Sequence, residues 1–211
     1  FSKFASTKED LNKTQQYKNR EKFVSDKKNY KDEMKYLKSI NLKPKIHFLQ
    51  NTNIDRAVQL SKKTNQFNFN NTEYSHAKIK EFAKKNICFL VSLKDNYGDH
   101  GLIALVCAKI INKKNLYIEN FLMSCRILGR YLEYSIINEL KKISKKNKLK
   151  NIIFQFIPTK KNQPVTNFIL ESGLKKLSII EAEKMSLPKK KCAYYLQDVN
   201  KKIPFVEIYE K

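Results

Sequence analysis

A strand pattern, a glycine turn and a helix pattern follow one another without a gap in the middle of this sequence. Residues 116–125 form an apolar run of aromatic and branched side chains, as in a buried strand. The run enters the turn 126–130, which contains Gly129, and a helical pattern continues to Ile143. Backbone N–H groups and the positive end of a helix dipole meet at such a turn, so we expect an anion-binding cradle there.

A second strand and a second helix complete this part of the sequence. The apolar run 151–157 stops at Pro158. The helix pattern that follows Pro164 ends at Gly173, a residue suited to a left-handed cap. Because strand, helix and strand follow in this order, we expect a parallel strand pair joined by a right-handed crossover.

The residues before this segment predict three antiparallel strands. Residues 87–93 and 102–111 are apolar runs on either side of a long polar turn at 94–101, and the run 116–125 is the third strand. The predicted fold is a mixed α/β (α+β) fold with a central mixed sheet flanked by helices. The remaining patterns predict helices at 53–61 and 72–86, and strands at 45–50, 177–180, 192–196 and 204–209.

The charge of the chain does not by itself indicate a partner. The net charge is +23, but the excess is almost all lysine, spread along the chain among asparagine and isoleucine. We find no basic stripe interleaved with aromatic residues, so nucleic-acid binding is not expected. No apolar run approaches the length of a membrane span. The four cysteines show no metal-binding spacing, which predicts a cytoplasmic protein without a metal site.

Arginine and glycine are rare, which makes their positions informative. Arginine occurs only at Arg20, Arg56, Arg126 and Arg130, and the last two flank Gly129. In a chain so rich in lysine, an arginine that remains is expected where a planar guanidinium is needed for a phosphate or a carboxylate.

The order of elements resembles the GNAT acyltransferase fold. The pyrophosphate signature of that family is Gln/Arg-x-x-Gly-x-Gly/Ala, and this chain has Arg126-Ile-Leu-Gly-Arg-Tyr131, with Tyr131 in place of a small residue. The helix that opens at Asn162 resembles the second motif of the family. The resemblance implies that coenzyme A, or the phosphopantetheine of a carrier protein, is held by Arg126, Leu128, Gly129, Arg130, Tyr131 and Asn162.

Four strings resemble a narrower family, the C-terminal part of FkbH-like proteins (HAD-superfamily subfamily IIIC). They are KTNQFNFN at 63–70, YGDHGL at 97–102, FLMSCRILGR at 121–130 and IPTKKNQPV at 157–165. The resemblance implies that 1–44 is a charged helical linker after an upstream HAD-like domain and that 45–211 is a GNAT-like domain. The chain begins with Phe rather than Met, so we expect a fragment of a longer protein. The Asp-x-Asp nucleophile motif is absent, so phosphatase activity is not expected of it.

The same resemblance implies the transfer of an acyl group of the glyceryl type from an acyl phosphate to a phosphopantetheine thiol. A thiol at the end of a strand and beside Arg126 suits a nucleophile, so Cys125 is our candidate to carry the acyl group. The alternative is an inert, buried cysteine. Glu119 on the same strand is either a general base or the partner of a nearby lysine.

Two loops are candidates for contacts with substrate. The segment 63–70 has neither the helix nor the strand period, so we expect a polar loop pinned by Phe67 and Phe69. The alternative role of both loops is ordinary turn and capping chemistry. We expect His100 to be an exposed turn residue. The predicted substrate-binding residues are Thr64, Asn65, Gln66, Asn68, Ser124, Thr159 and Lys161.

The sequence leaves two functions open. The first is an acyltransferase, and the second is a non-catalytic GNAT-like module that positions an acyl carrier protein or coenzyme A for the HAD-like domain. Acyl carrier proteins are acidic, so a surface rich in lysine favours encounter with one under either function.

Overall fold

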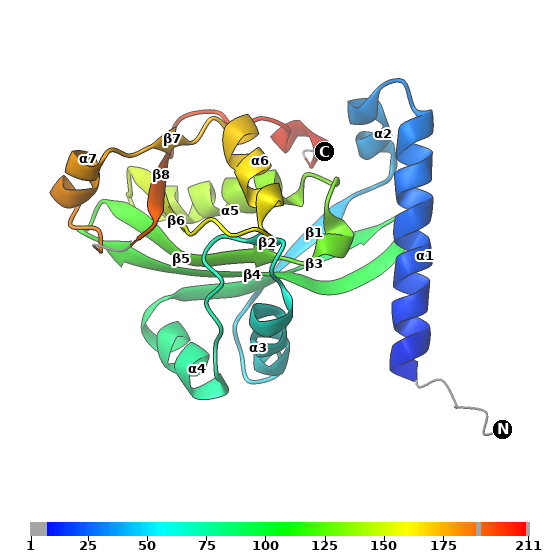
Figure 1. Cartoon of the computed structure of the whole chain (residues 1–211), viewed down its shortest axis with the longest axis horizontal. Helices are drawn as coiled ribbons and strands as arrows, with labels where there is room; N and C mark the ends of the chain where they lie inside the picture. The colour runs from blue at the N-terminus through cyan, green and yellow to red at the C-terminus, as the bar shows by residue number, and fades with distance from the viewer. Residues whose placement is uncertain (1–7, 189–190, 210–211) are drawn as a thin grey trace.

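The computed structural model describes residues 8–188 and 191–209, with side chains from residue 15 onward. Eight strands form one mixed sheet in the order β1-β3-β4-β5-β6-β8-β7, with β2 paired to β5 (Figure 1). The strands are β1 (Lys43–Phe48), β2 (Phe67–Asn68), β3 (Ile87–Asp95), β4 (Gly98–Ile111), β5 (Asn115–Met123), β6 (Asn151–Phe156), β7 (Lys175–Lys176) and β8 (Ala193–Asp198).

Helices cover both faces of the sheet. In Figure 1, α3 and α4 lie on one face, α5 and α6 lie on the other, and α1 stands across one end of the sheet. Among the described residues, no helix has both the length and the apolar character needed to cross a membrane. The helices are α1 (Lys8–Asn29), α2 (Glu33–Ser39), α3 (Ile54–Lys63), α4 (His76–Lys85), α5 (Leu132–Lys146), α6 (Gln163–Ser172) and α7 (Ile179–Lys184), with 3-10 turns η1 (Cys125–Ile127) and η2 (Val206–Ile208).

The central strand–helix–strand unit is as predicted. Strands β5 and β6 are parallel, from Asn115 opposite Asn151 to Ile118 opposite Phe154, and α5 connects them. Gly173 ends α6 with a φ of 71°, the left-handed conformation expected of a glycine cap. The mixed α/β fold and the central mixed sheet are therefore confirmed.

Several predicted boundaries were wrong for local reasons. The turn between β3 and β4 spans only residues 96–97, because both strands extend into the polar segment 94–101. Helix α4 starts at His76 rather than near Thr72, because the Ser75 hydroxyl accepts the N–H of Lys78. The expected helix 53–61 is α3, and the expected strands 45–50 and 192–196 are β1 and β8.

Two of the C-terminal strands expected from the sequence are not strands. In the segment 177–180, Ser178 and Glu181 form a capping box, so a helix begins there and leaves Ile179 exposed. In the segment 204–209, Phe205 has a φ of 60° and opens the 3-10 turn η2. Apolar character alone could not distinguish these turns from strands.

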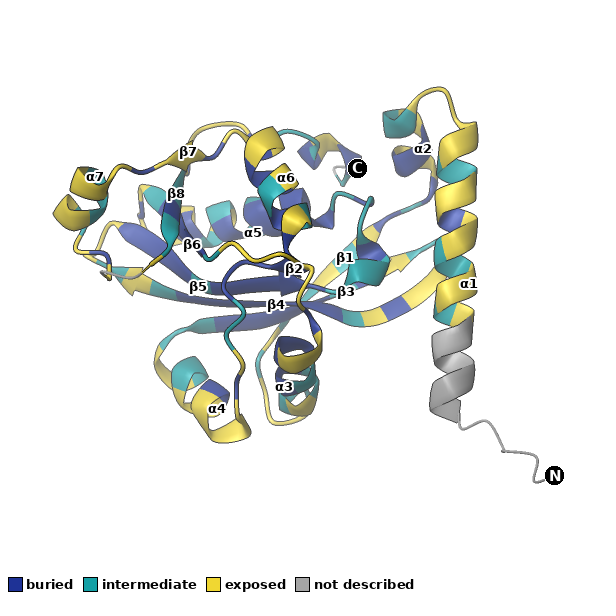
Figure 2. Ribbon diagram, viewed as in Figure 1, coloured by how far each residue is buried: buried dark blue, intermediate teal, exposed yellow. Residues whose placement is uncertain are grey.

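The segment before β1 belongs to the main core rather than to a surface connector. Figure 2 shows buried positions on the inner side of α1 and α2, and exposed positions on the outer side. Phe23 of α1 and Leu37 of α2 are almost fully buried, in the same cluster as Phe89 and Val106 of the sheet. The division at residue 44 stays a prediction, but the residues described on both sides of it share one core.

Candidate functional site

Helix α1 covers the glycine turn that the sequence singled out. The turn lies between β5 and α5, and both Gly129 and Tyr131 have positive φ, of 88° and 55°. The Lys27 ammonium group of α1 donates a hydrogen bond to the Gly129 carbonyl at 3.1 Å. Phe23 of α1 also lies beside Gly129, because a Cβ at this glycine would be 3.6 Å from its ring.

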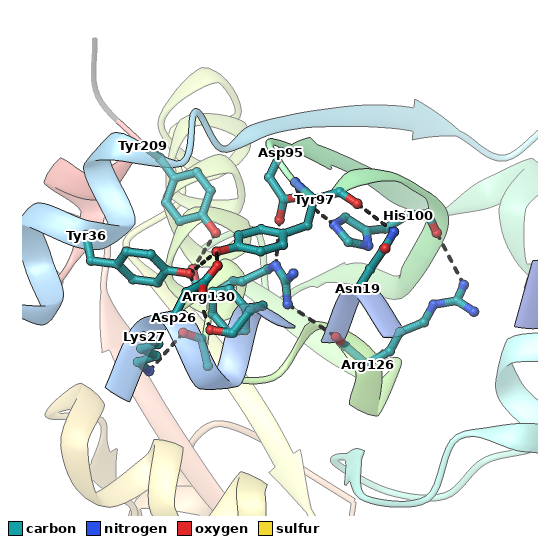
Figure 3. A network of polar contacts seen from close by, with 12 residues as sticks. Asn19, Asp26, Lys27, Tyr36, Asp95, Tyr97, His100, Arg126, Arg130 and Tyr209 are labelled. Atoms are coloured by element: carbon teal, nitrogen blue, oxygen red, sulfur yellow. Dashed lines mark hydrogen bonds and ion pairs between the residues drawn. The ribbon is translucent and has the colours of Figure 1, made fainter. Parts of the chain in front are cut away.

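Arg130 points into the protein. Its guanidinium is fully buried, and Nε donates to Oδ2 of Asp95 at 2.6 Å (Figure 3). The guanidinium carbon lies 3.8 Å from the ring centroid of Phe23, a cation–π contact. His100 approaches the other carboxylate oxygen of Asp95 at 2.9 Å. Burial would raise the pKa of Asp95, but His100 and Arg130 outweigh it and lower that pKa.

Tyrosine hydroxyls extend this buried group towards α1 and the C-terminal residues. The Tyr97 hydroxyl donates to Asp26 at 2.5 Å and lies 2.5 Å from the hydroxyl of Tyr36 (Figure 3). The Tyr209 hydroxyl donates to the Arg130 carbonyl at 2.6 Å. The surroundings of Arg130 thus form a structural junction between α1, α2, the β3–β4 turn and the end of the chain.

The first turn of α5 already holds an acidic side chain. Glu133 is buried there, and one of its carboxylate oxygens has no hydrogen-bond partner among the described residues. Burial raises the pKa of Glu133 to about 7. Tyr131 stacks on Phe205, with ring centroids 4.6 Å apart. A phosphate at this helix start would meet a carboxyl group and an aromatic side chain.

The protein itself occupies part of the glycine turn. Arg130 is paired with Asp95, the N–H of Leu128 donates to the Cys125 carbonyl, and the N–H of Arg130 donates to the Ile127 carbonyl. These three groups are not available to the pyrophosphate of coenzyme A. The cradle formed by Arg126, Leu128, Gly129, Arg130 and Tyr131 stays a prediction, and Arg126 itself lines a cleft on the other side of the sheet.

The edge of β5 beside β6 is also filled. Strands β5 and β6 pair over only four residues, and β2 then pairs with β5 at Met123 and Leu122. Phe69 joins the two sides, because its N–H donates to the Phe121 carbonyl at 3.0 Å and its carbonyl accepts the N–H of Ile157 at 2.8 Å. An extended ligand arm could not add to β5 at this edge while the segment is in place.

Asn162 and Asn68 hold this filling segment. The Asn162 amide donates to the carbonyls of Asn68 and Ile157, both at 3.0 Å, and its oxygen accepts the N–H of Thr159 at 2.7 Å. The Asn68 side chain is fully buried and donates to the Thr64 carbonyl at 2.8 Å. The predicted ligand-binding roles of Asn162 and Asn68 are corrected, because these amides serve the fold. The expected loop 63–70 is pinned by the buried Phe67 and Phe69 as predicted, but Phe67–Asn68 pair with β5 as the short strand β2.

A cleft of about 590 Å³ lies on the α3 side of the sheet. Helix α3, the start of β4, the end of β5 and α1 all contribute to it. Three of the four sequence strings that carry the narrower resemblance meet in it. Its lining residues are Gln16, Arg56, Gln59, Leu60, Lys63, Thr64, Asp99, His100, Gly101, Leu102, Ser124 and Arg126.

Two arginines face this cleft, and their hydrogen bonds go to neutral acceptors. Arg56 donates to the Leu102 carbonyl at 2.9 Å and to the side-chain oxygen of Gln59. Arg126 donates to the side-chain oxygen of Gln16 at 2.5 Å and to the His100 carbonyl at 3.2 Å. Burial lowers the pKa of both arginines, and the positive charge of Arg126 further lowers that of Arg56.

The predicted reactive residues fall into two groups. Ser124 and Thr64 line the cleft, whereas Cys125, half-buried, is not among its lining residues and lies in the chain between Ser124 and Arg126, which are. Glu119 lies outside this lining and pairs with Lys109 at 3.0 Å, which was the alternative we gave for it.

The other predicted substrate-binding residues do not line the cleft, whereas His100 does. Asn65 and Gln66 are exposed, and so are Thr159 and Lys161 on the loop after β6. His100 is buried, not exposed as we expected, because Asp95 and the β3–β4 hairpin enclose it. A second hollow, of about 700 Å³, lies between α7 and β8, and its lining is mainly apolar.

Sequence reasoning assigned no site role to most residues of the cleft, and four of these carry a charge or a side-chain amide on α3 or β4. They are Arg56 and Gln59, one helical turn apart on α3, Lys63 at the end of α3, and Asp99 at the start of β4. The rarity of arginine was the signal that could have selected Arg56. Nothing in the sequence alone placed it beside Arg126, which is 70 positions away.

The fold is that of the GNAT acetyltransferases. A GNAT-family acetyltransferase from Staphylococcus aureus matches with a TM-score of 0.57 and 8% identity, over 75% of this chain and all of that one. The spermidine N-acetyltransferase of Vibrio cholerae, solved with coenzyme A and spermine, matches with a TM-score of 0.51 and 13% identity, over 75% and 96%. At such identities the likeness concerns the fold alone. No protein-family model and no curated protein matches the sequence.

Proposed function

We propose that this chain is an acyl-transfer domain whose second substrate is a phosphopantetheine thiol, on an acyl carrier protein or on coenzyme A. The GNAT fold supports the reaction class. The observation that carries the proposal is the position of Cys125, between two residues that both line the cleft, Ser124 and Arg126. The polar lining suits a hydroxylated acyl group of the glyceryl type.

The proposed first step is nucleophilic. The thiolate sulfur of Cys125 bonds to the acyl carbonyl carbon, and the bond from that carbon to the donor's leaving atom breaks. The thiol proton passes to water, and the leaving group departs as an anion. Arg126, the next residue in the chain, carries the positive charge that stabilises such an anion.

Intact mass measurement tests this step. Wild-type protein is incubated with acetyl phosphate, and in parallel with acetyl-coenzyme A, and is then treated with hydroxylamine to cleave thioesters. We expect an acyl adduct on the wild type and on Cys192→Ser, which removes another half-buried free cysteine, but no thioester on Cys125→Ser. A hydroxylamine-labile adduct that persists in Cys125→Ser, or no such adduct on the wild type from either donor, contradicts the nucleophilic role.

The proposed partners are an acyl carrier protein and an upstream HAD-like domain, and the proposed compartment is the cytoplasm. The net charge of +23 supports encounter with an acidic carrier. The four cysteines are free in the structure, as a reducing compartment would keep them. Association with an acyl carrier protein that weakens steeply as salt is added would support this partner.

A second candidate function is a non-catalytic module that positions a carrier protein or coenzyme A for the HAD-like domain. One observation favours it, namely that α1 covers the glycine turn and Arg130 is paired with Asp95. A module of this kind binds carrier protein equally well as wild type and as Cys125→Ser, and forms no adduct. The mass experiment therefore separates the two functions.

A further inference from the structure

We propose that the cleft between Arg56 and Arg126 binds the dianionic phosphate group of a small molecule. This inference goes beyond the proposed function, because binding there requires no transfer chemistry and no reactive thiol. It assigns the ligand site to the α3 side of the sheet rather than to the glycine turn.

The cleft carries positive charge that the described residues do not neutralise. Within the described residues, neither Arg56 nor Arg126 forms an ion pair with a carboxylate. Asp99 is the one carboxylate of the lining, and Lys94, outside the cleft, holds it at 2.9 Å. Lys63 adds a third positive charge. Partly buried charges without a counter-ion are costly, so a site of this composition favours an anion.

The hydrogen-bonding capacity of the two guanidiniums is not used up. A guanidinium has five N–H donors in a fixed fork. Arg56 makes two hydrogen bonds and Arg126 makes two, all to neutral oxygens. The Nε atom of Arg126 is buried and has no partner among the described residues. Arg130 also has a buried nitrogen, Nη2, without a partner among the described residues, but its Nε meets the Asp95 carboxylate at 2.6 Å, and Arg56 and Arg126 have no such carboxylate there.

The neutral residues around the arginines suit a phosphate ester. Thr64 and Ser124 carry hydroxyl groups. Gly101 also lies in the lining, and its N–H donates to the Asp99 carboxylate at 2.9 Å. Gln16 and Gln59 orient the two guanidiniums through their side-chain oxygens. The volume of about 590 Å³ is in the range of small-molecule sites, so the body of the ligand also has room.

The charge balance favours a dianion over a single carboxylate. Three cationic side chains line the cleft against one carboxylate that already has an external partner. A phosphate monoester carries nearly two negative charges at neutral pH, and its oxygens match the guanidinium fork. A monocarboxylate would leave more of the positive charge unmatched.

Titration calorimetry with inorganic phosphate tests the site, at about pH 8, where phosphate is mainly dianionic, and at constant ionic strength set with sodium chloride. We expect saturable binding to the wild type. We expect the affinity of Arg56→Gln and of Arg126→Gln to be lower by about tenfold or more, since each loses charge-assisted hydrogen bonds. Arg20→Gln is the matched control. It removes an arginine of α1 that lines a different pocket, and it should bind like the wild type.

Folding is monitored by circular dichroism and thermal unfolding for every variant. Arg126 joins α1 to β4, so Arg126→Gln could lose its fold. In that case Arg56→Gln, together with Arg56→Lys, which keeps the charge and loses the fork, carries the test. We expect Arg56→Lys to bind between the wild type and Arg56→Gln.

Three results would overturn the inference. They are the absence of saturable phosphate binding, equal binding by folded Arg56→Gln and the wild type, and acetate bound as tightly as phosphate. Phosphate binding by a protein that forms no Cys125 adduct would support this inference and remove the proposed function. A Cys125 adduct on a protein that does not bind phosphate would support the proposed function and overturn this inference.

Discussion

Arg130 and the pair Arg56 and Arg126 are environments of opposite kinds in one small protein. Arg130 is fully buried and shares a carboxylate with His100, and aromatic rings lie over it. The other two face a cleft and donate only to neutral oxygens. The difference teaches that the rarity of arginine in the sequence marks these residues as important but does not distinguish a structural role from a ligand-binding role. The partner of the guanidinium separates a structural role from a binding role.

The largest expected effect is on the Arg130 side of the comparison. Arg130→Met leaves Asp95 buried without its guanidinium partner and removes the contact with Phe23, so we expect a loss of about 3–5 kcal/mol in the free energy of unfolding. Urea denaturation measures it, with Arg20→Met as the control for loss of an arginine. A loss below about 1 kcal/mol would mean that Arg130 is not a structural residue.

The next effect concerns Glu133, the buried acidic residue in the first turn of α5. Its pKa is raised from 4.5 to about 7 in the folded protein, so the folded state binds the proton more tightly than the unfolded state. This contribution to stability is therefore present below about pH 4.5 and is lost as the pH rises to about 7. The free energy of unfolding should fall by at most about 3 kcal/mol over that range.

Glu133→Gln removes this dependence. In urea denaturation at about pH 5 and about pH 8, the free energy of unfolding of the variant should increase relative to that of the wild type as the pH rises. Glu139→Gln, on the same helix and paired with Lys142, is the control and should follow the wild type. If Glu133→Gln and the wild type lose stability in parallel, Glu133 is ionised in the folded protein and the turn is more polar than we describe.

The smallest effect tests the glycine turn directly. Gly129→Ala forces a side chain into a φ of 88°, and we expect a loss of about 1–2 kcal/mol in the free energy of unfolding. Gly173→Ala, at a φ of 71° with open space around it, is the matched control for strain alone. Neither variant should change phosphate binding. Weaker phosphate binding by Gly129→Ala with unchanged stability would mean that the phosphate binds at the glycine turn rather than in the cleft.

The sequence predicted the centre of the fold better than its periphery. The parallel pair of β5 and β6, the crossover helix and the cap at Gly173 follow from local periods and turn residues, which act within a few positions. The strands predicted at 177–180 and 204–209 were wrong, because a capping box starts a helix in the first segment and a residue with positive φ opens a 3-10 turn in the second. Within the expected loop 63–70, the sequence missed only the two-residue strand β2, because that strand exists only through pairing with β5.

The candidate site divides in the same way. The sequence by itself determined a GNAT-like order of elements, the few arginines and the thiol next to one of them. Only the tertiary structure decided that Arg130 would meet Asp95, that α1 would cover Gly129, and that Arg56 would face the cleft that Arg126 lines. The physical reason is that local patterns fix helices and strands, whereas the partner of a charge depends on which distant segments the sheet brings together.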